Sequence, residues 1–171
     1  KVLDVFCNQG GFALACAKAG ATSVTAVDSS ESAIEATKRN AELNEVEINA
    51  IKANAFDFLK NCEETYDLII LDPPSFTRNK KTLKDAMRGY KEIHLRGIKL
   101  LERNGILSTY CCSHHATREL YLENVVSASV DAKRSLRLVK NHGQRADHPI
   151  MIGIPETEYL KGFTFQLAPS R

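Results

Sequence analysis

The stretch YDLIILDPPSF occupies residues 66–76 and decides the fold class of this chain. Its first half, Tyr66–Leu71, is the clearest strand pattern in the sequence, since its apolar run is typical of a strand buried on both faces. The run ends at Asp72-Pro73-Pro74, and neither a helix nor a central strand could continue through two prolines. In α/β proteins, ligands bind beyond the carboxyl ends of such strands. The stretch therefore predicts a buried strand that ends in a rigid acidic turn at a binding edge.

Strand and helix patterns alternate on both sides of this stretch. Further strands are predicted at residues 2–6, 23–27, 48–53, 106–110, 136–140 and 163–167. Helices are predicted at residues 12–20, 31–44, 56–59, 82–101 and 116–130. This order indicates βαβ units, and so a mainly parallel sheet with helices on both faces.

Length and composition are those of one ordinary globular domain. The chain has 171 residues, of which 43% are hydrophobic and 26% are charged. This composition excludes a disordered or collagen-like protein. The sequence contains no apolar stretch long enough for a membrane span and no signal-peptide pattern. Five cysteines without paired spacing indicate a reduced, cytoplasmic protein. Because Lys1 rather than Met opens directly on a strand pattern, we expect a further N-terminal part to precede it.

Charge is distributed unevenly along the chain. Residues 1–77 carry six Lys/Arg against twelve Asp/Glu, a net charge of −6, whereas residues 78–171 carry 17 against nine, a net charge of +8. A basic half favours a surface that meets a polyanion such as RNA. An unevenly charged but merely solvated surface is the alternative, and composition alone leaves both open.

The ends of the first two predicted strands indicate a nucleoside ligand. Gly10 and Gly11 follow the first strand, which contains Asp4, and glycines at such a turn let the backbone approach a ligand closely. The pattern is not GxGxxG, which disfavours a dinucleotide. Asp28 ends the second strand, where a carboxylate can accept hydrogen bonds from ribose hydroxyls. Together these features favour an adenosyl ligand, although each alone could be a plain turn or a helix cap.

Two other strand ends carry groups suited to chemistry on a nucleobase. The prolines of DPPSF fix Asp72 and the Pro73 carbonyl, which suits recognition of an exocyclic amine or a ring nitrogen. Cys111 and Cys112 end the strand at 106–110, and alternation predicts that Cys111 packs inward while Cys112 faces the opposite side. A thiolate that adds to pyrimidine C6 makes C5 nucleophilic, provided that the base lies outside its stack. No zinc spacing such as CxxC is present, so no metal is expected.

The segments VLDVFCNQGGFALACAKAGA, VTAVDSS, NAFDFL and LIILDPPSF resemble, in this order, the class I S-adenosylmethionine-dependent methyltransferases. The resemblance implies a Rossmann-like fold with a seven-stranded, mainly parallel sheet and an antiparallel C-terminal strand. Two departures are Asn54, where many relatives carry an acid, and Cys7, an uncommon residue in the first turn. The resemblance implies that the cofactor is held by Asp4, Phe6, Cys7, Asn8, Gln9, Gly10, Gly11, Asp28, Ser29, Asn54, Ala55, Asp72 and Pro73.

DPPSFTRNK, GYKEIHLRGIKLL, NGILSTYCCS and QRADHPIMIGIPETEYLKGF look like the RlmI-type family of bacterial 5-methylcytosine methyltransferases acting on 23S ribosomal RNA. This resemblance implies that Cys112 is the nucleophile and that Asp72 contacts the N3 and N4 edge of cytosine. Members of the family also carry an N-terminal RNA-binding PUA domain, which these residues do not include. Substrate contacts are implied or expected for Pro74, Arg78, Lys80, Lys81, Gln144, Asp147 and His148.

The sequence therefore predicts one catalytic domain over residues 1–171 that methylates cytosine C5 in ribosomal RNA through a cysteine–C6 adduct. An RNA guanine-N methyltransferase without a thiol nucleophile is one alternative. A noncatalytic RNA-binding scaffold of the same fold is another. The target nucleotide and the oligomeric state, including a homodimer, stay open.

Overall fold

All seven predicted strands form one sheet in the computed structural model, which describes residues 1–77 and 79–169. Their order across the sheet is β3-β2-β1-β4-β5-β7-β6. The pairs along β3, β2, β1, β4 and β5 are parallel, and β7 runs antiparallel to both neighbours. This confirms the mainly parallel sheet with an antiparallel last strand. The strands are β1 (Val2–Val5), β2 (Val24–Asp28), β3 (Asn49–Lys52), β4 (Tyr66–Leu71), β5 (Leu101–Cys111), β6 (Leu136–His142) and β7 (Lys161–Leu167).

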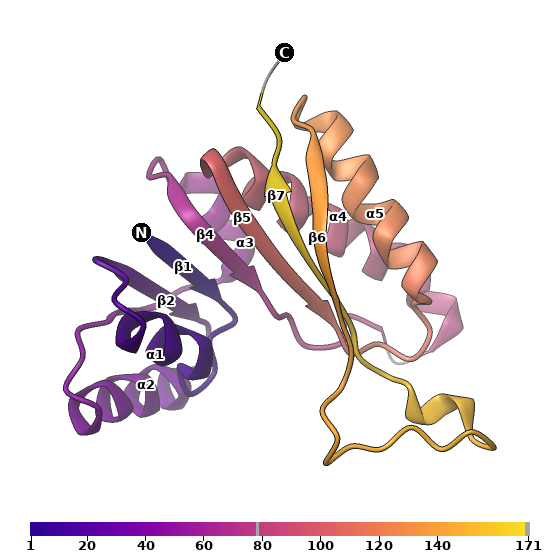
Figure 1. The fold of residues 1–171 in the computed structure, drawn as a ribbon, viewed down its shortest axis with the longest axis horizontal. Coiled ribbons are helices and arrows are strands. Elements are labelled where there is room, and N and C mark those ends of the chain that lie inside the picture. Colours follow the sequence, from indigo (N-terminus) through magenta and orange to yellow (C-terminus); the bar gives the residue numbers. More distant parts are fainter. Residues whose placement is uncertain (78, 170–171) are drawn as a thin grey trace.

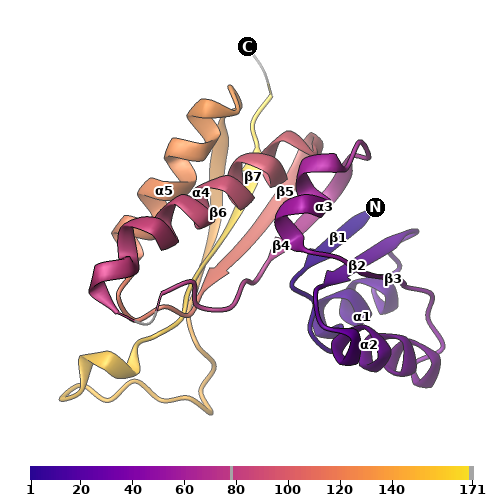
Figure 2. The same ribbon diagram turned by 180° about the vertical axis from the view of Figure 1, so that it is seen from behind.

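Helices cover both faces of the sheet, as predicted. In Figure 1, α1 and α2 lie in front of β1 and β2, and Figure 2 shows α3, α4 and α5 on the opposite face. Among the described residues, no helix has the length and apolarity to cross a membrane. The helices are α1 (Gly11–Lys18), α2 (Glu31–Leu43), α3 (Ala55–Asn61), α4 (Leu83–Lys99) and α5 (Arg118–Asp131), with short 3-10 turns at Lys80–Thr82 and Pro155–Thr157.

The strand expected at 106–110 is longer than the pattern predicted. It begins at Leu101, which pairs with Tyr66, and the register then shifts so that Ile106 pairs with Leu68. Asn104 has a φ of +63°, and a Cβ added at Gly105 would lie 2.9 Å from the Glu102 carbonyl oxygen. Asn104 and Gly105 therefore lie in an irregularity inside β5, between the pair at Leu101 and the regular pairing that begins at Ile106.

A buried polar network fixes α4 and α5 against β5. The His94 ring lies 3.0 Å from Asn124 Oδ1 through Nδ1 and 3.0 Å from Thr109 Oγ1 through Nε2. The Tyr121 hydroxyl lies 2.7 Å from Thr109 Oγ1 and donates to the Tyr110 carbonyl at 2.8 Å. Burial lowers the pKa of His94 to about 4, so the ring is neutral at physiological pH. The network sets the position of the carboxyl end of β5, where the two adjacent cysteines lie.

Candidate functional site

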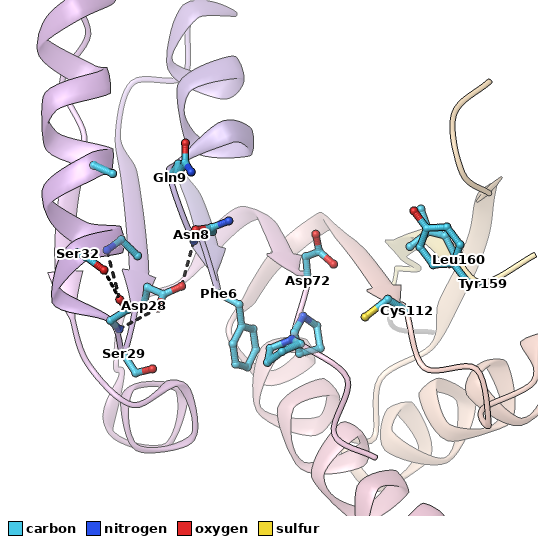
Figure 3. A pocket seen from close by; sticks show the side chains of 15 residues that line it. Phe6, Asn8, Gln9, Asp28, Ser29, Ser32, Asp72, Cys112, Tyr159 and Leu160 are labelled. Atoms are coloured by element: carbon cyan, nitrogen blue, oxygen red, sulfur yellow. Dashed lines mark hydrogen bonds between the residues drawn. The ribbon is translucent and has the colours of Figure 1, made fainter. Parts of the chain in front are cut away.

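A cleft of about 890 Å³ opens at the carboxyl edge of the sheet, where the sequence predicted a binding edge. It collects nine of the predicted site residues from the ends of β1, β2, β4 and β5 (Figure 3). These nine are Phe6, Asn8, Gln9, Asp28, Ser29, Asp72, Pro73, Pro74 and Cys112, and the lining is completed by Ser30, Ser32, Ala33, Ala36, Tyr159 and Leu160.

The turn after β1 is tight and is anchored to α2. Phe6, Asn8 and Gly10 have φ values of +67°, +48° and +81°. Thr37 Oγ1 donates to the Asn8 carbonyl at 2.9 Å, and Asn40 Nδ2 donates to the Gln9 carbonyl at 3.0 Å. A Cβ at Gly10 would lie 2.8 Å from Thr37 Cγ2, so this position requires glycine both for its φ and for its space. The turn therefore presents its backbone to the cleft in one fixed conformation.

Asp28 links this turn to the start of α2. Its Oδ2 accepts the Asn8 backbone N–H at 3.0 Å and its Oδ1 accepts the Ser30 backbone N–H at 2.9 Å (Figure 3). Ser30 then caps α2 by accepting from the Ala33 N–H. Each carboxylate oxygen has a further lone pair for a donor in the cleft. Asp28 can thus serve the turn and a ligand at once.

Asp4 lies behind the cleft and is almost fully buried. Its Oδ2 accepts the Ala13 N–H at 3.0 Å, whereas its Oδ1 has no partner among the described residues. Burial is the largest cause that raises the pKa of Asp4 to about 7; the carboxylates of Asp72 and Asp28 contribute to this rise, and the hydrogen bond from the Ala13 N–H opposes it. Three carboxylates close together favour a cationic ligand in this part of the cleft.

Cys7 is inert in this turn. Its side chain is buried, and its Sγ lies 3.9 Å from Thr37 Oγ1. Burial raises the pKa of its thiol to about 12, so the reactive thiolate is absent at neutral pH. The unusual cysteine of the first turn is therefore a small packing residue.

Aromatic rings pack next to the turn Asp72-Pro73-Pro74. Phe76 stacks on Tyr90 with ring centroids 4.6 Å apart and meets Phe6 edge-on at 6.2 Å. Burial raises the pKa of the Asp72 carboxyl. Its acid form therefore persists to higher pH than that of an exposed aspartate, so this carboxyl can both donate and accept hydrogen bonds.

The two adjacent cysteines face opposite sides of β5, as alternation predicted. Cys111 is fully buried in the core, whereas Cys112 lines the cleft. Burial raises the pKa of the Cys112 thiol, and Cys111 and Asp72 add to this rise, while Lys161 opposes it. Figure 3 shows Asp72 and Cys112 at the ends of the neighbouring strands β4 and β5, with the Cys112 sulfur toward the cleft.

Sequence reasoning missed three residues beside Cys112. Lys161, at the start of β7, is buried, and its Nζ donates to the Ser113 carbonyl at 2.5 Å. Tyr159 and Leu160 line the cleft immediately before it. The available signal in the sequence was a lysine and a tyrosine next to the predicted strand at 163–167. They reach Cys112 only because β7 pairs with β5, and these two strands lie far apart in the chain.

Several predicted site residues lie outside the cleft lining. The Asn54 side chain accepts from the N–H groups of Phe56 and Asp57 and caps α3, and Ala55 is buried in the core.

Gln144 donates to the Thr157 carbonyl at 2.5 Å and accepts the Tyr159 N–H at 3.2 Å, so it anchors the segment that carries Tyr159. Asp147 and His148 are exposed on that segment, Lys81 is exposed before α4, and Gly11 begins α1. Arg78 lies outside the described residues, and of Lys80 only the backbone is described. Their roles as ligand contacts stay predictions.

Among the described residues, no group of three or more His, Cys, Asp or Glu side chains is arranged to hold a metal ion.

Comparisons with known proteins agree on the family and the fold. The family model described as "Methyltransferase small domain" matches residues 1–138. Proteins named "Ribosomal RNA large subunit methyltransferase I" match 95% of this chain, at 38% identity in Cronobacter sakazakii and 37% in Escherichia coli O139:H28. The solved structure of SMU.776 complexed with SAH superposes with a TM-score of 0.84 at 24% identity, covering 96% of this chain and 44% of that one. The chain spans 43% of the length of the two named relatives.

Proposed function

This chain belongs to the methyltransferase small domain family, and we propose that it transfers a methyl group from S-adenosylmethionine to C5 of a cytosine in ribosomal RNA. The observation that carries the proposal is that the Cys112 thiol and the Asp72 carboxyl line the same cleft. A thiol and a carboxyl together are what C5 methylation of a pyrimidine requires. The names of the relatives support ribosomal RNA as the substrate. The five free cysteines are consistent with a cytoplasmic site of action.

The cleft fits S-adenosylmethionine. Asp28 offers carboxylate oxygens for ribose hydroxyls, and the fixed turn at residues 6–10 leaves room for the methionine part. Among the described residues, the buried Oδ1 of Asp4 has no hydrogen-bond donor, and the carboxylates around it suit a ligand that carries a sulfonium and an ammonium. When bound, S-adenosylmethionine supplies an electrophilic methyl group. Asp4, Asp28, Ser29 and the turn would hold it with that group toward Asp72 and Cys112.

The residues of the cleft can activate cytosine in a balanced sequence. The Cys112 thiolate forms a bond from Sγ to C6, and the electron pair of the C5–C6 bond moves toward C5. The acid form of Asp72 gives its proton to N3 as the adduct forms, while its carbonyl oxygen accepts from the N4 amine, which makes C6 more electrophilic. N3 returns this proton to Asp72 when the adduct collapses. After C5 has taken the methyl group, a base removes the C5 proton, the C5–C6 double bond re-forms and the S–C6 bond breaks. Cys112 leaves as the thiolate that entered.

One observation favours the nitrogen-methylating alternative. The pKa of the Cys112 thiol is raised, so little thiolate exists at neutral pH in the structure as it stands. A guanine-N methyltransferase needs only the acid and carbonyl of Asp72-Pro73 and no thiolate. The two reactions leave chemically different products, 5-methylcytosine and N-methylguanine.

Mass spectrometry of ribosomal RNA distinguishes them. Nucleosides from ribosomal RNA of cells with and without the gene should differ by one 5-methylcytosine, and adding back the gene should restore it. Loss of an N-methylguanine instead would establish the alternative. An unchanged nucleoside profile, together with no binding of S-adenosylmethionine by the protein, would establish the noncatalytic scaffold.

Replacing Asp28 by alanine should weaken S-adenosylmethionine binding at least about tenfold in calorimetry, because each hydrogen bond to a charged group contributes about 1.5–3 kcal/mol. Since Asp28 also organises the turn, a matched control is needed. Asn40→Ala removes the hydrogen bond from α2 to the Gln9 carbonyl and so loosens the same turn, while every side chain that lines the cleft stays in place; it should cost about 1 kcal/mol of stability with little change in affinity. If both variants lose the same affinity, Asp28 acts only through the turn.

A further inference from the structure

An apolar tip protrudes beside the cleft. It consists of Ile150, Met151, Ile152 and Ile154, whose side chains are 52%, 53%, 100% and 52% exposed. The segment that carries them connects β6 to β7 and projects beyond the carboxyl edge of the sheet in both views (Figures 1 and 2). Contiguous exposed apolar side chains on a soluble protein mark a surface that is covered during function.

The tip is preformed. Met151 and Ile154 form an isolated bridge, and the Ile154 N–H donates to the Met151 carbonyl at 2.8 Å, which closes a turn around Ile152-Gly153. Thr157 braces this turn, because its Oγ1 accepts the Met151 N–H at 2.8 Å and donates to the Ile154 carbonyl at 2.7 Å. The apolar side chains are therefore presented in one arrangement without an ordering cost.

The base of the same segment belongs to the reaction site. Gln144 bonds to the carbonyls of His148 and Thr157 and to the Tyr159 N–H, which closes the segment at its base. Tyr159 and Leu160 then line the cleft that holds Cys112. A nucleotide that reaches Cys112 therefore lies next to the base of the segment that carries the tip.

We propose that this tip is a wedge that enters the RNA base stack where the target cytosine leaves it. The inference rests on the proposed function, because C5 and C6 of a cytosine are out of reach of a thiol until the base is extruded. Isoleucine and methionine side chains inserted between base steps are a known way to hold nucleic acid unstacked. A second protein is disfavoured as the occupant, since four side chains fall far short of the roughly 1,600 Å² of a standard interface, whereas a wedge needs only one or two residues.

Once mass spectrometry of ribosomal RNA fragments has located the methylated cytosine, the test compares two synthetic RNA duplexes that contain this cytosine in its ribosomal flanking sequence. In one duplex the cytosine is paired with guanine, and in the other it lies opposite an abasic site, so that it is already unpaired. Ile152→Asp should lower kcat/KM about tenfold or more on the paired duplex, because the apolar side chain no longer stabilises the opened base stack when the cytosine is extruded. The decrease should be much smaller on the abasic duplex. 2-Aminopurine placed next to the cytosine should brighten on binding the wild-type protein and not on binding Ile152→Asp.

Two further variants serve as controls. Ile152→Leu keeps an apolar side chain and should behave as wild type. Leu43→Asp, at the 76% exposed end of α2, introduces the same charge away from the tip and should change neither duplex. An equal loss on both duplexes, or an unchanged Ile152→Asp protein, would overturn the wedge. Methylation of neither duplex by the wild-type protein would instead overturn the proposed function.

Discussion

Cys112→Ala should abolish methylation, with a loss on the order of a thousandfold or more, while Cys111→Ala should retain most of it. The two thiols are neighbours in the sequence, but only Cys112 lines the cleft, and Cys111 is fully buried in the core. Truncating Cys111 leaves a small cavity and should lower the free energy of unfolding by about 1 kcal/mol. S-adenosylmethionine should still bind to both variants, because the thiol serves the base.

A covalent trap identifies the attacking sulfur directly. In RNA that carries 5-fluorocytosine at the target position, fluorine replaces the proton that must leave C5. The bond from Sγ to C6 then persists after methyl transfer, so a protein–RNA adduct should survive denaturing electrophoresis. The adduct should form with wild type and Cys111→Ala but not with Cys112→Ala. An adduct that depends on Cys111 would reverse the assignment, and full methylation by both variants would point to the nitrogen-methylating alternative.

The sheet and the binding edge could be predicted because their signals are local. Apolar runs such as Tyr66–Leu71 mark buried strands wherever they occur, and the carboxyl ends of parallel strands meet at one edge. For this reason Asn8, Asp28, Asp72 and Cys112, which lie far apart in the chain, could be expected in one cleft before any coordinates were known.

The residues around Cys112 could not be predicted in the same way. Lys161 reaches the Ser113 carbonyl because β7 returns antiparallel beside β5 with Lys161 opposite Cys111. That register is decided by packing of Phe163 and Phe165 in the core rather than by a local pattern. Tyr159 enters the cleft for the same reason, since it directly precedes this strand.

Asn54 illustrates a position with two possible roles. The resemblance implies that it contacts the cofactor, which stays a prediction, and its side chain also accepts the N–H groups of Phe56 and Asp57 as the cap of α3. Asparagine before a helix is a strong capping signal. Because Asn54 lies between the end of β3 and the start of α3, the sequence is compatible both with a helix cap and with a ligand contact. The backbone N–H groups of such a helix end stay available to a ligand only where the cap leaves them free.

Asp72 should separate base recognition from catalysis. Asp72→Ala is expected to lower kcat by about a hundredfold to ten-thousandfold, since it removes both the donor to N3 and the acceptor from the N4 amine. Asp72→Asn keeps a donor and an acceptor in the same places, so KM for RNA should stay near wild type. The amide cannot give up a proton, however, so kcat should fall nearly as far as in Asp72→Ala.

The pH profile of kcat/KM carries the decisive signature of Asp72. Burial raises the pKa of both Asp72 and Cys112, and the reaction needs the acid form of the first and the thiolate of the second. Between the two pKa values, the thiolate fraction rises with pH as fast as the acid fraction falls, so the wild-type profile should be flat. In Asp72→Asn only the thiolate titrates, and kcat/KM should rise about tenfold per pH unit until Cys112 is ionised. A wild-type profile that rises with pH in the same way as that of Asp72→Asn would mean that the carboxyl holds the base without transferring a proton, because its ionisation would then leave the rate unchanged.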